Sequence, residues 1–286
     1  MVRPVSRALD LMHLGRDRVI CSWVVDGVVV DPGPASCLDA LVAGLGGEEP
    51  RALLLTHVHL DHAGAAGVLV RRYPDLRVYV HERGAPHVID PSRLLASAER
   101  LYGEQMERLW GEVAPVPEEN VTALSGGENV EGFGVTYAPG HASHHVVYLH
   151  EQSGDAFVGD VAGVCIPPSD FTVAPTPPPD IDLDAWRCSL DELEALGPRA
   201  LCLTHFGRRG DVGAQLNAIR ERLGSWGELA RTGDREAFVA SVREQIRAAV
   251  QGIDASAAEA YEQAAPADQL WAGLERYWRK REEAAA

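Results

Sequence analysis

A run of metal-binding residue types follows a predicted buried strand early in the chain. Residues 56–62 read Thr-His-Val-His-Leu-Asp-His, so three imidazoles and one carboxylate fall within six consecutive positions. The preceding residues, 51–56, include Ala-Leu-Leu-Leu, an apolar run typical of a central strand buried on both faces. Neutral imidazoles and a carboxylate offer lone pairs to the same cation, so metal binding explains this run better than packing does. We therefore expect a metal site at the end of this strand.

The rest of the chain reads as strands alternating with helices, followed by a helical tail. Short runs rich in Val, Leu and Ile predict strands at 18–25, 28–31, 51–56, 77–80, 121–124, 135–138, 146–150, 156–158 and 200–204. Helical spacing predicts helices at 36–45, 63–73, 90–109 and 184–196, and only helices after Asp211. Segment 163–182 holds six of the 18 prolines, and long irregular segments inside a domain are usually functional. We expect this segment to border a pocket.

The motif can serve two neighbouring cations. His57 and His59 are two positions apart at a strand end, so both side chains point to one side and can converge on one cation. Asp61 and His62 lie just beyond, where the chain turns toward a helix, and can aim at a second cation. Three later residues also end apolar segments, as ligands at the rim of a sheet would: His141, Asp160 and His205.

The order and context of these seven residues resemble the metallo-β-lactamase superfamily. The resemblance runs from about Val19 to Phe206 and is carried by Val30-Asp31-Pro32-Gly33, Thr56 to Gly64, Pro139-Gly140-His141, Gly159-Asp160 and Thr204-His205. It implies an α/β (α+β) fold, the αββα sandwich with two mixed sheets inside and helices outside. We expect residues 1–211 to form this catalytic domain and residues 212–286 to form a helical C-terminal extension packed on it.

The resemblance also implies a pair of cations that share one carboxylate. It puts His57, His59 and His141 on one cation, Asp61, His62 and His205 on the other, and Asp160 between them. A hydroxide would bridge such a pair, because the two cations would lower the pKa of a bound water; Asp61 would also orient this hydroxide. Two zinc ions are expected, because the diiron flavoproteins of the superfamily typically carry Glu where His59 stands; iron and manganese are the alternatives.

The fold and the metal ligands do not determine which substrate a member of so diverse a superfamily acts on. The chain looks most like the glyoxalase II and lactonase relatives, which predicts hydrolysis of a small carboxylic ester, lactone or thioester. The alternatives are a persulfide-type dioxygenase with a single iron on His57, His141 and Asp160, a β-lactam- or phosphodiester-cleaving member, and a non-catalytic binding protein. The C-terminal helices are expected either to wall the pocket or to cover the sheet or form a homodimer. The candidate substrate-binding residues are Tyr102, Phe171, Arg208 and His144, the last of which is more typical of an outer hydrogen-bonding shell.

Composition narrows the class of partner. The net charge of −16 argues against nucleic acid as the main partner, so a small-molecule substrate is expected. No stretch approaches the roughly 20 apolar residues of a membrane span, and residues 1–7 lack the apolar core of a signal peptide, which predicts the cytoplasm. The five cysteines form no close pair in the sequence, and that pattern favours reduced thiols over a disulfide framework.

Overall fold

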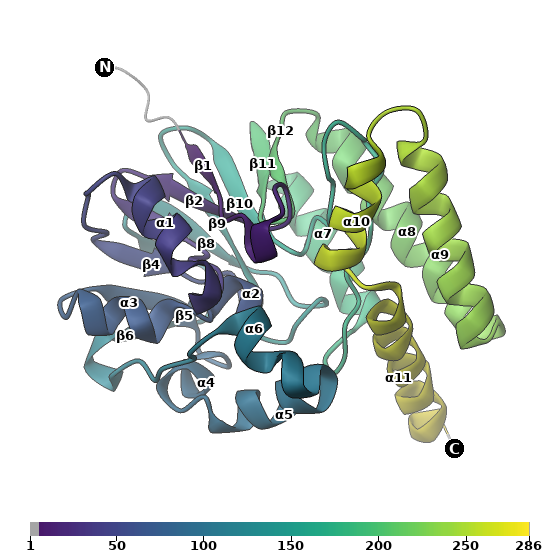
Figure 1. The fold of residues 1–286 in the computed structure, drawn as a ribbon, viewed down its shortest axis with the longest axis horizontal. Helices are drawn as coiled ribbons and strands as arrows, with labels where there is room; N and C mark the ends of the chain where they lie inside the picture. Colours follow the sequence, from purple (N-terminus) through teal and green to yellow (C-terminus); the bar gives the residue numbers. More distant parts are fainter. Residues whose placement is uncertain (1–5, 286) are drawn as a thin grey trace.

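Two six-stranded sheets stacked face to face form the centre of the protein. The structure, a computed structural model, describes residues 6–285; residues 1–5, part of the N-terminal stretch considered above, lie outside the described residues. Figure 1 shows the strands left of centre, with α1 and α3 at the left, α4 to α6 below them and the C-terminal helices at the right. This arrangement is the predicted αββα sandwich with a helical C-terminal part.

The first sheet contains the first six strands in chain order. They are β1 (Arg7–Asp10), β2 (Cys21–Val25), β3 (Val28–Val30), β4 (Ala52–Leu54), β5 (Arg77–His81) and β6 (Val121–Leu124). Strands β1 to β3 pair antiparallel, whereas β3 to β6 pair parallel. Parallel neighbours need crossover connections, and helices supply them here. These helices are α1 (Leu38–Leu45), α2 (Leu60–Ala63), α3 (Ala66–Arg72), α4 (Ala85–Ile89), α5 (Ser92–Tyr102) and α6 (Met106–Trp110).

The second sheet has the order β12-β11-β10-β9-β8-β7. Its strands are β7 (Asn129–Val130), β8 (Phe133–Tyr137), β9 (Val146–His150), β10 (Asp155–Gly159), β11 (Ala200–Leu203) and β12 (Gly207–Arg209). Only β10 and β11 pair parallel, and helix α7 (Leu183–Ala195) lies in the connection between them. The sheet is therefore mixed, like the first.

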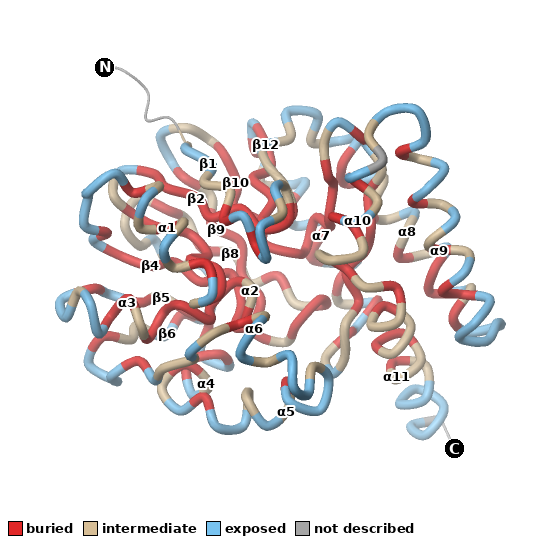
Figure 2. The backbone as a smooth tube through the Cα atoms, viewed as in Figure 1, coloured by how far each residue is buried: buried red, intermediate tan, exposed pale blue. Residues whose placement is uncertain are grey.

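Alternation along the strands builds the core on both faces of each sheet. Trp23, Val30 and Leu54 point between the sheets and pack with Phe157 and Tyr148 of the second sheet. Their neighbours Val24, Val29 and Leu53 point outward and belong to the larger core that also contains residues of α1, α3, α7 and α8. Figure 2 shows the result, with buried residues along the strands and exposed residues on the outer helix surfaces.

The last part of the chain forms four helices. They are α8 (Val212–Thr232), α9 (Arg235–Val250), α10 (Ala255–Ala264) and α11 (Ala267–Ala285). Asp211, Asp234 and Asp254 cap the first three, each accepting a hydrogen bond from a backbone N–H of the first turn. None of the described helices is both long enough and apolar enough to cross a membrane.

The C-terminal helices hold the long segment 163–182 in place. The Tyr261 hydroxyl of α10 donates to the carbonyl of Phe171 at 2.6 Å. At Gly273 of α11, an added Cβ would lie 2.0 Å from the carbonyl oxygen of Thr176, so only glycine allows this close approach. The Thr176 hydroxyl donates to the carbonyl of Leu270 at 3.0 Å. This part of the chain therefore supports the segment that leads to the site described next.

Three expectations about the elements were wrong in detail. The predicted helix at 90–109 is divided, because α5 ends before Gly103, which adopts a φ of 50° before α6 begins. The predicted helix at 63–73 instead begins at Leu60 as the short α2 and continues as α3. Strands β1, β7 and β12 were not expected; they are short and lie at sheet edges, where local patterning is weakest.

Candidate metal centre

The predicted ligands meet where strands of both sheets end. His57 and His59 lie between β4 and α2, and His141 follows β8. Asp160 directly follows β10. His205 follows β11, the parallel neighbour of β10, with Thr204 between the strand and the histidine. All of these residues are buried or half-buried.

One cluster consists of three imidazoles. Nδ1 of His59 lies 3.0 Å from Nε2 of His57 and 3.0 Å from Nε2 of His141. Ligand atoms on a tetrahedral cation at ~2.05 Å are about 3.3 Å apart, so these separations suit one metal ion. The three rings therefore form a group that could hold a cation.

A second cluster combines imidazoles with a carboxylate. Nε2 of His205 lies 3.3 Å from Oδ2 of Asp61, and Nε2 of His62 lies 3.8 Å from the same oxygen. These three residues form another group that could hold a cation.

Asp160 lies between the two clusters. Its Oδ2 is 3.4 Å from Nε2 of His141, whereas its Oδ1 is 3.3 Å from Nε2 of His62 and 3.6 Å from Nε2 of His205. Each carboxylate oxygen thus faces a different cluster, which is the arrangement that a bridging ligand needs.

Three buried atoms of the candidate ligands have no hydrogen-bond partner. They are Nε2 of His62, Nε2 of His205 and Oδ1 of Asp160. An unpaired buried polar atom is costly, and three of them pointing at one space call for a partner that the protein itself does not supply. Nitrogen and carboxylate donors are the ligands that zinc and iron prefer, so this donor set fits a metal ion.

Hydrogen bonds fix the orientation of the rings. Nδ1 of His141 donates to the carbonyl of Pro175 at 2.8 Å, and Nδ1 of His205 donates to the carbonyl of Val19 at 2.5 Å. A carbonyl can only accept, so Nδ1 of each ring carries a proton and Nε2 points into the cluster, where it can bind a cation once it is unprotonated. The Pro175 carbonyl belongs to the segment held by α11, which links the C-terminal helices to the orientation of His141.

Asp31 connects the two sheets beneath the site. Its Oδ2 accepts from the hydroxyls of Thr56 and Thr204 and from Nδ1 of His62, at 2.7, 3.0 and 2.8 Å. Its Oδ1 accepts from the backbone N–H of Thr56 at 2.8 Å. This fully buried carboxylate therefore fixes the orientation of the His62 ring and the position of Thr56 at the start of the motif.

The position before Asp160 requires a glycine, Gly159. Its φ is 48°, and an added Cβ would lie 2.4 Å from Oγ1 of Thr56 and 2.8 Å from Nε2 of His145. That histidine nitrogen accepts a hydrogen bond from the backbone N–H of Asp160 at 3.3 Å. The His145 ring also stacks on His57, with centroids 4.9 Å apart. His145 thus contacts both His57 and Asp160.

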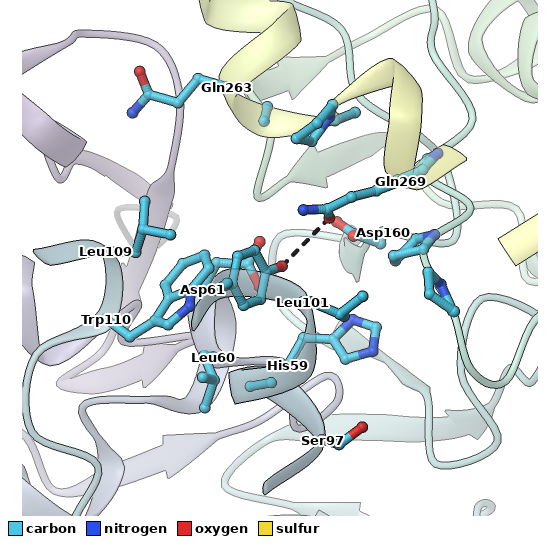
Figure 3. Close-up of a pocket in the computed structure, with 18 of the residues that line it drawn as sticks. His59, Leu60, Asp61, Ser97, Leu101, Leu109, Trp110, Asp160, Gln263 and Gln269 are labelled. Carbon is cyan, nitrogen blue, oxygen red and sulfur yellow. Dashed lines mark hydrogen bonds between the residues drawn. The ribbon is translucent and has the colours of Figure 1, made fainter. Parts of the chain in front are cut away.

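A cavity of about 310 Å³ lies over the clusters, and His59, Asp61 and Asp160 form part of its lining. Figure 3 shows these three side chains together with Leu109 and Trp110 on one side and Gln263 and Gln269 projecting from the C-terminal helices. The expectation that segment 163–182 borders the pocket is confirmed by its four lining prolines: Pro175, Pro177, Pro178 and Pro179.

Only one of the four candidate substrate-binding residues lines this cavity. Tyr102 does, and its hydroxyl donates to Oε1 of Gln269 at 3.4 Å. Phe171 instead packs against Tyr261 and beneath the Arg222 guanidinium. Arg208 forms an ion pair with Asp155 at 2.8 Å. His144 is buried, with its Nδ1 accepting from the backbone N–H of Val58 at 3.4 Å, and does not line the cavity.

Comparison with known proteins identifies the family. The sequence model described as the metallo-beta-lactamase superfamily matches residues 16–205, which is more than half of the chain. The chain belongs to the metallo-beta-lactamase superfamily. A hydroxyacylglutathione hydrolase from a Synechococcus species is 34% identical over 143 residues, which cover 48% of this chain and 45% of that protein. The chain spans about half the length of the curated relatives it matches.

Solved structures agree with the superfamily fold. A metallo-beta-lactamase family protein from Thermus thermophilus has a TM-score of 0.65 at 21% identity, covering 99% of this chain and 95% of that one. A protein named TTHA1623, solved in a di-iron-bound form, is 30% identical with a TM-score of 0.51, covering 67% of this chain and 87% of that one. The similarity to the Thermus thermophilus protein extends over the whole fold, including the C-terminal helices.

The electrostatics of this superfamily site differ between the clusters. Burial lowers the pKa of His57 and His141 below the usual value and that of His59 to about 4, so these rings are neutral at pH 7. Burial also disfavours the charged forms of His62 and His205. There, however, the carboxylates of Asp160 and Asp61 outweigh burial and raise the pKa of both rings. Without a cation, the second cluster therefore holds protons that the first does not.

We expect acid to release the two cations in sequence. Cations bind imidazoles that have lost their protons, so affinity falls once the pH drops below the pKa of the free ligand. The second cluster should lose its cation at the higher pH because the pKa values of His62 and His205 are raised, whereas the pKa of His59 is lowered to about 4 and that ring stays free for a cation in more acidic solution. Metal content measured after dialysis against a weak chelator at about pH 8, 6 and 4 should fall stepwise. Loss of both cations in one step would contradict this order.

Several cavity residues were not predicted from the sequence. His13 stacks on Trp110 at 5.7 Å, and its Nδ1 lies 3.1 Å from the Gln263 amide nitrogen. These residues come from the N-terminal region, α6 and α10, and only folding brings them together. The one available signal was the high apolar content of residues 94–110, which indicates a helix face but not what it faces.

Proposed function

We propose that this protein is a binuclear metal-dependent hydrolase acting on a small carboxylic ester, lactone or thioester. The observation that carries the proposal is the convergence of two donor clusters, linked by Asp160, at one side of a mostly apolar cavity. Catalytic metal sites keep an open position for water and substrate, and here His59, Asp61 and Asp160 border open space. A purely structural metal site would be closed on all sides.

The residues that would hold the cations are those of the two clusters. His57, His59 and His141 would bind one, Asp61, His62 and His205 the other, and Asp160 would bridge them. Cations bound there supply a water of lowered pKa as nucleophile and polarise the carbonyl of the substrate. We favour zinc because of the imidazole-rich donor set, with iron and manganese as alternatives. The di-iron form of TTHA1623 makes iron the first alternative to test.

Asp61 is suited to orient the attacking water. Burial disfavours its charged form, but His62 and His205 outweigh burial and lower its pKa, so it is an ionised acceptor at neutral pH. Its side chain is 22% exposed and lines the cavity, so it can accept a hydrogen bond from a water beside the substrate. The carboxylate thus holds one proton of the water and aims a lone pair toward the carbonyl.

A substrate panel tests the proposal. Protein loaded with zinc, iron or manganese is assayed on neutral esters, lactones, thioesters, β-lactams and phosphodiesters, with metal content measured in parallel. We expect about two cations per chain and hydrolysis of an ester, lactone or thioester. A single iron per chain together with oxygen uptake on a persulfide would favour the dioxygenase alternative. No hydrolysis by any metal form that holds two cations would overturn the proposal.

A further inference from the structure

The walls of the cavity carry no cation. Among the described residues, the lining includes neither Lys nor Arg, and its acidic members are Asp61 and Asp160. His13 is the lining histidine outside the clusters, and burial lowers its pKa, so it is neutral at pH 7. A charge carried by a substrate several bonds away from the reacting carbonyl would therefore find no positive partner in these walls.

Three separate parts of the chain make the walls apolar. Helices α5 and α6 contribute Leu94, Leu101 and Trp110, and the proline-rich segment contributes its four prolines. The stretch between α10 and α11 contributes Ala265 and Pro266. Because these parts surround the space opposite the clusters, a bound molecule that reaches His59 and Asp160 also contacts apolar side chains. Burial of apolar substrate surface would thus favour binding.

Neutral hydrogen-bonding groups complete the lining. Nε1 of Trp110 is buried without a hydrogen-bond partner, although its ring lines the cavity. The Tyr102 hydroxyl and the Gln269 amide meet at 3.4 Å on the same lining. The Gln269 amide nitrogen is a neutral donor that suits an uncharged acceptor such as a carbonyl or ether oxygen, and the lining offers no Lys or Arg to compensate a buried carboxylate.

We propose that the cavity selects uncharged substrates with an apolar acyl chain, and that it discriminates against thioesters of anionic carriers such as glutathione. The inference rests on the proposed hydrolase function and names the substrate class of that same site. The inference predicts that the preferred substrate of this chain differs from the one in the name of its hydroxyacylglutathione hydrolase relatives. In the described part of the chain, three cations contact residues of the lining without lining the cavity themselves. Arg276 and Lys280 donate to the carbonyl of Pro179 at 3.2 and 3.4 Å, and Arg16 donates to Oε1 of Gln263 at 2.9 Å.

Two matched substrate pairs test the inference on the metal-loaded full chain. The first pair is 4-nitrophenyl hexanoate and the 4-nitrophenyl monoester of adipic acid, which differ in the charge at the far end of the chain. The second is the hexanoyl thioester of N-acetylcysteamine and that of glutathione, which differ in the charge of the thiol. We expect kcat/KM to be at least about 100-fold higher for the neutral member of each pair, because a buried carboxylate without a partner is strongly disfavoured.

A charge introduced at the mouth provides a second test. Leu101 lines the cavity and is 43% exposed, so a long side chain fits there without disturbing the core. Leu101→Arg should raise kcat/KM for the adipic monoester about 10-fold relative to the hexanoate, whereas the neutral control Leu101→Gln should leave the ratio unchanged. Equal or better hydrolysis of the charged members by the unmodified protein overturns the substrate class and leaves the hydrolase function standing. No hydrolysis of any of the four substrates overturns the inference, and the hydrolase function falls with it only if the wider panel above, which includes lactones, also shows no hydrolysis.

Discussion

Asp160→Ala is expected to hold at most one cation per chain and to hydrolyse substrate at least ~1,000-fold more slowly than the unmodified protein. One oxygen of this carboxylate faces His141 and the other faces His62 and His205, so its removal takes a ligand from both clusters. The fold should persist, because the side chain makes no hydrogen bond to the surrounding backbone among the contacts of the described residues. The backbone N–H to His145 remains in the variant.

The control for this variant is a substitution of a carboxylate that lies outside the site. Asp191 lies on the exposed surface of α7 and pairs with Arg220, so Asp191→Asn should change neither metal content nor activity. Metal is quantified by mass spectrometry and fold by circular dichroism, so that a loss of activity can be separated from a loss of structure. Two cations per chain with normal activity in Asp160→Ala would exclude a bridging role.

The donor set could be predicted because most of it is local. Four of the seven donors lie within residues 57–62, where strand and turn geometry alone bring them together. The other three follow predicted strands, and the ends of neighbouring strands meet at one edge of a sheet. Strand prediction therefore carried enough spatial information to group His141, Asp160 and His205 with the motif. The zinc preference and the bridging role of Asp160 depended on the resemblance, whereas a second cation position was already expected from Asp61 and His62.

The cavity could not be predicted because its walls are assembled from distant segments. His13 and Gln263 are 250 positions apart in the sequence yet in hydrogen-bond contact. The break at Gly103 also decides where Trp110 lies, since an unbroken helix over 90–109 would direct that ring elsewhere. Phe171 and Arg208 were expected in the pocket and lie outside its lining, because Phe171 packs on Tyr261 and Arg208 pairs with Asp155. Edge strands and side-chain packing are non-local properties that periodicity does not report.

Asp31→Asn is expected to destabilise the protein and weaken the second metal site together. The substitution keeps the size of the side chain, and Asn tolerates the positive φ of 51° at this position, so the backbone is not strained. It puts an NH₂ group in place of one of two accepting oxygens: Oδ1 accepts from the backbone N–H of Thr56, and Oδ2 accepts from the hydroxyls of Thr56 and Thr204 and from Nδ1 of His62. Buried donors left without acceptors cost about 1–3 kcal/mol each, and we expect a total loss of ~2–4 kcal/mol.

The metal effect of Asp31→Asn follows from the tautomer of His62. With no carboxylate to accept from Nδ1, the proton can move to Nε2, the atom that faces Asp160 at 3.3 Å, and a protonated nitrogen cannot bind a cation. Affinity for the second cation should fall about 10- to 100-fold while the cation on His57, His59 and His141 is retained. Urea unfolding and competition with a chelating dye measure the two effects. Thr204→Val, which removes one hydroxyl donor and leaves the His62 contact, should lower stability less and leave metal affinity unchanged; equal metal loss in both variants would show that Asp31 acts through general stability and not through His62.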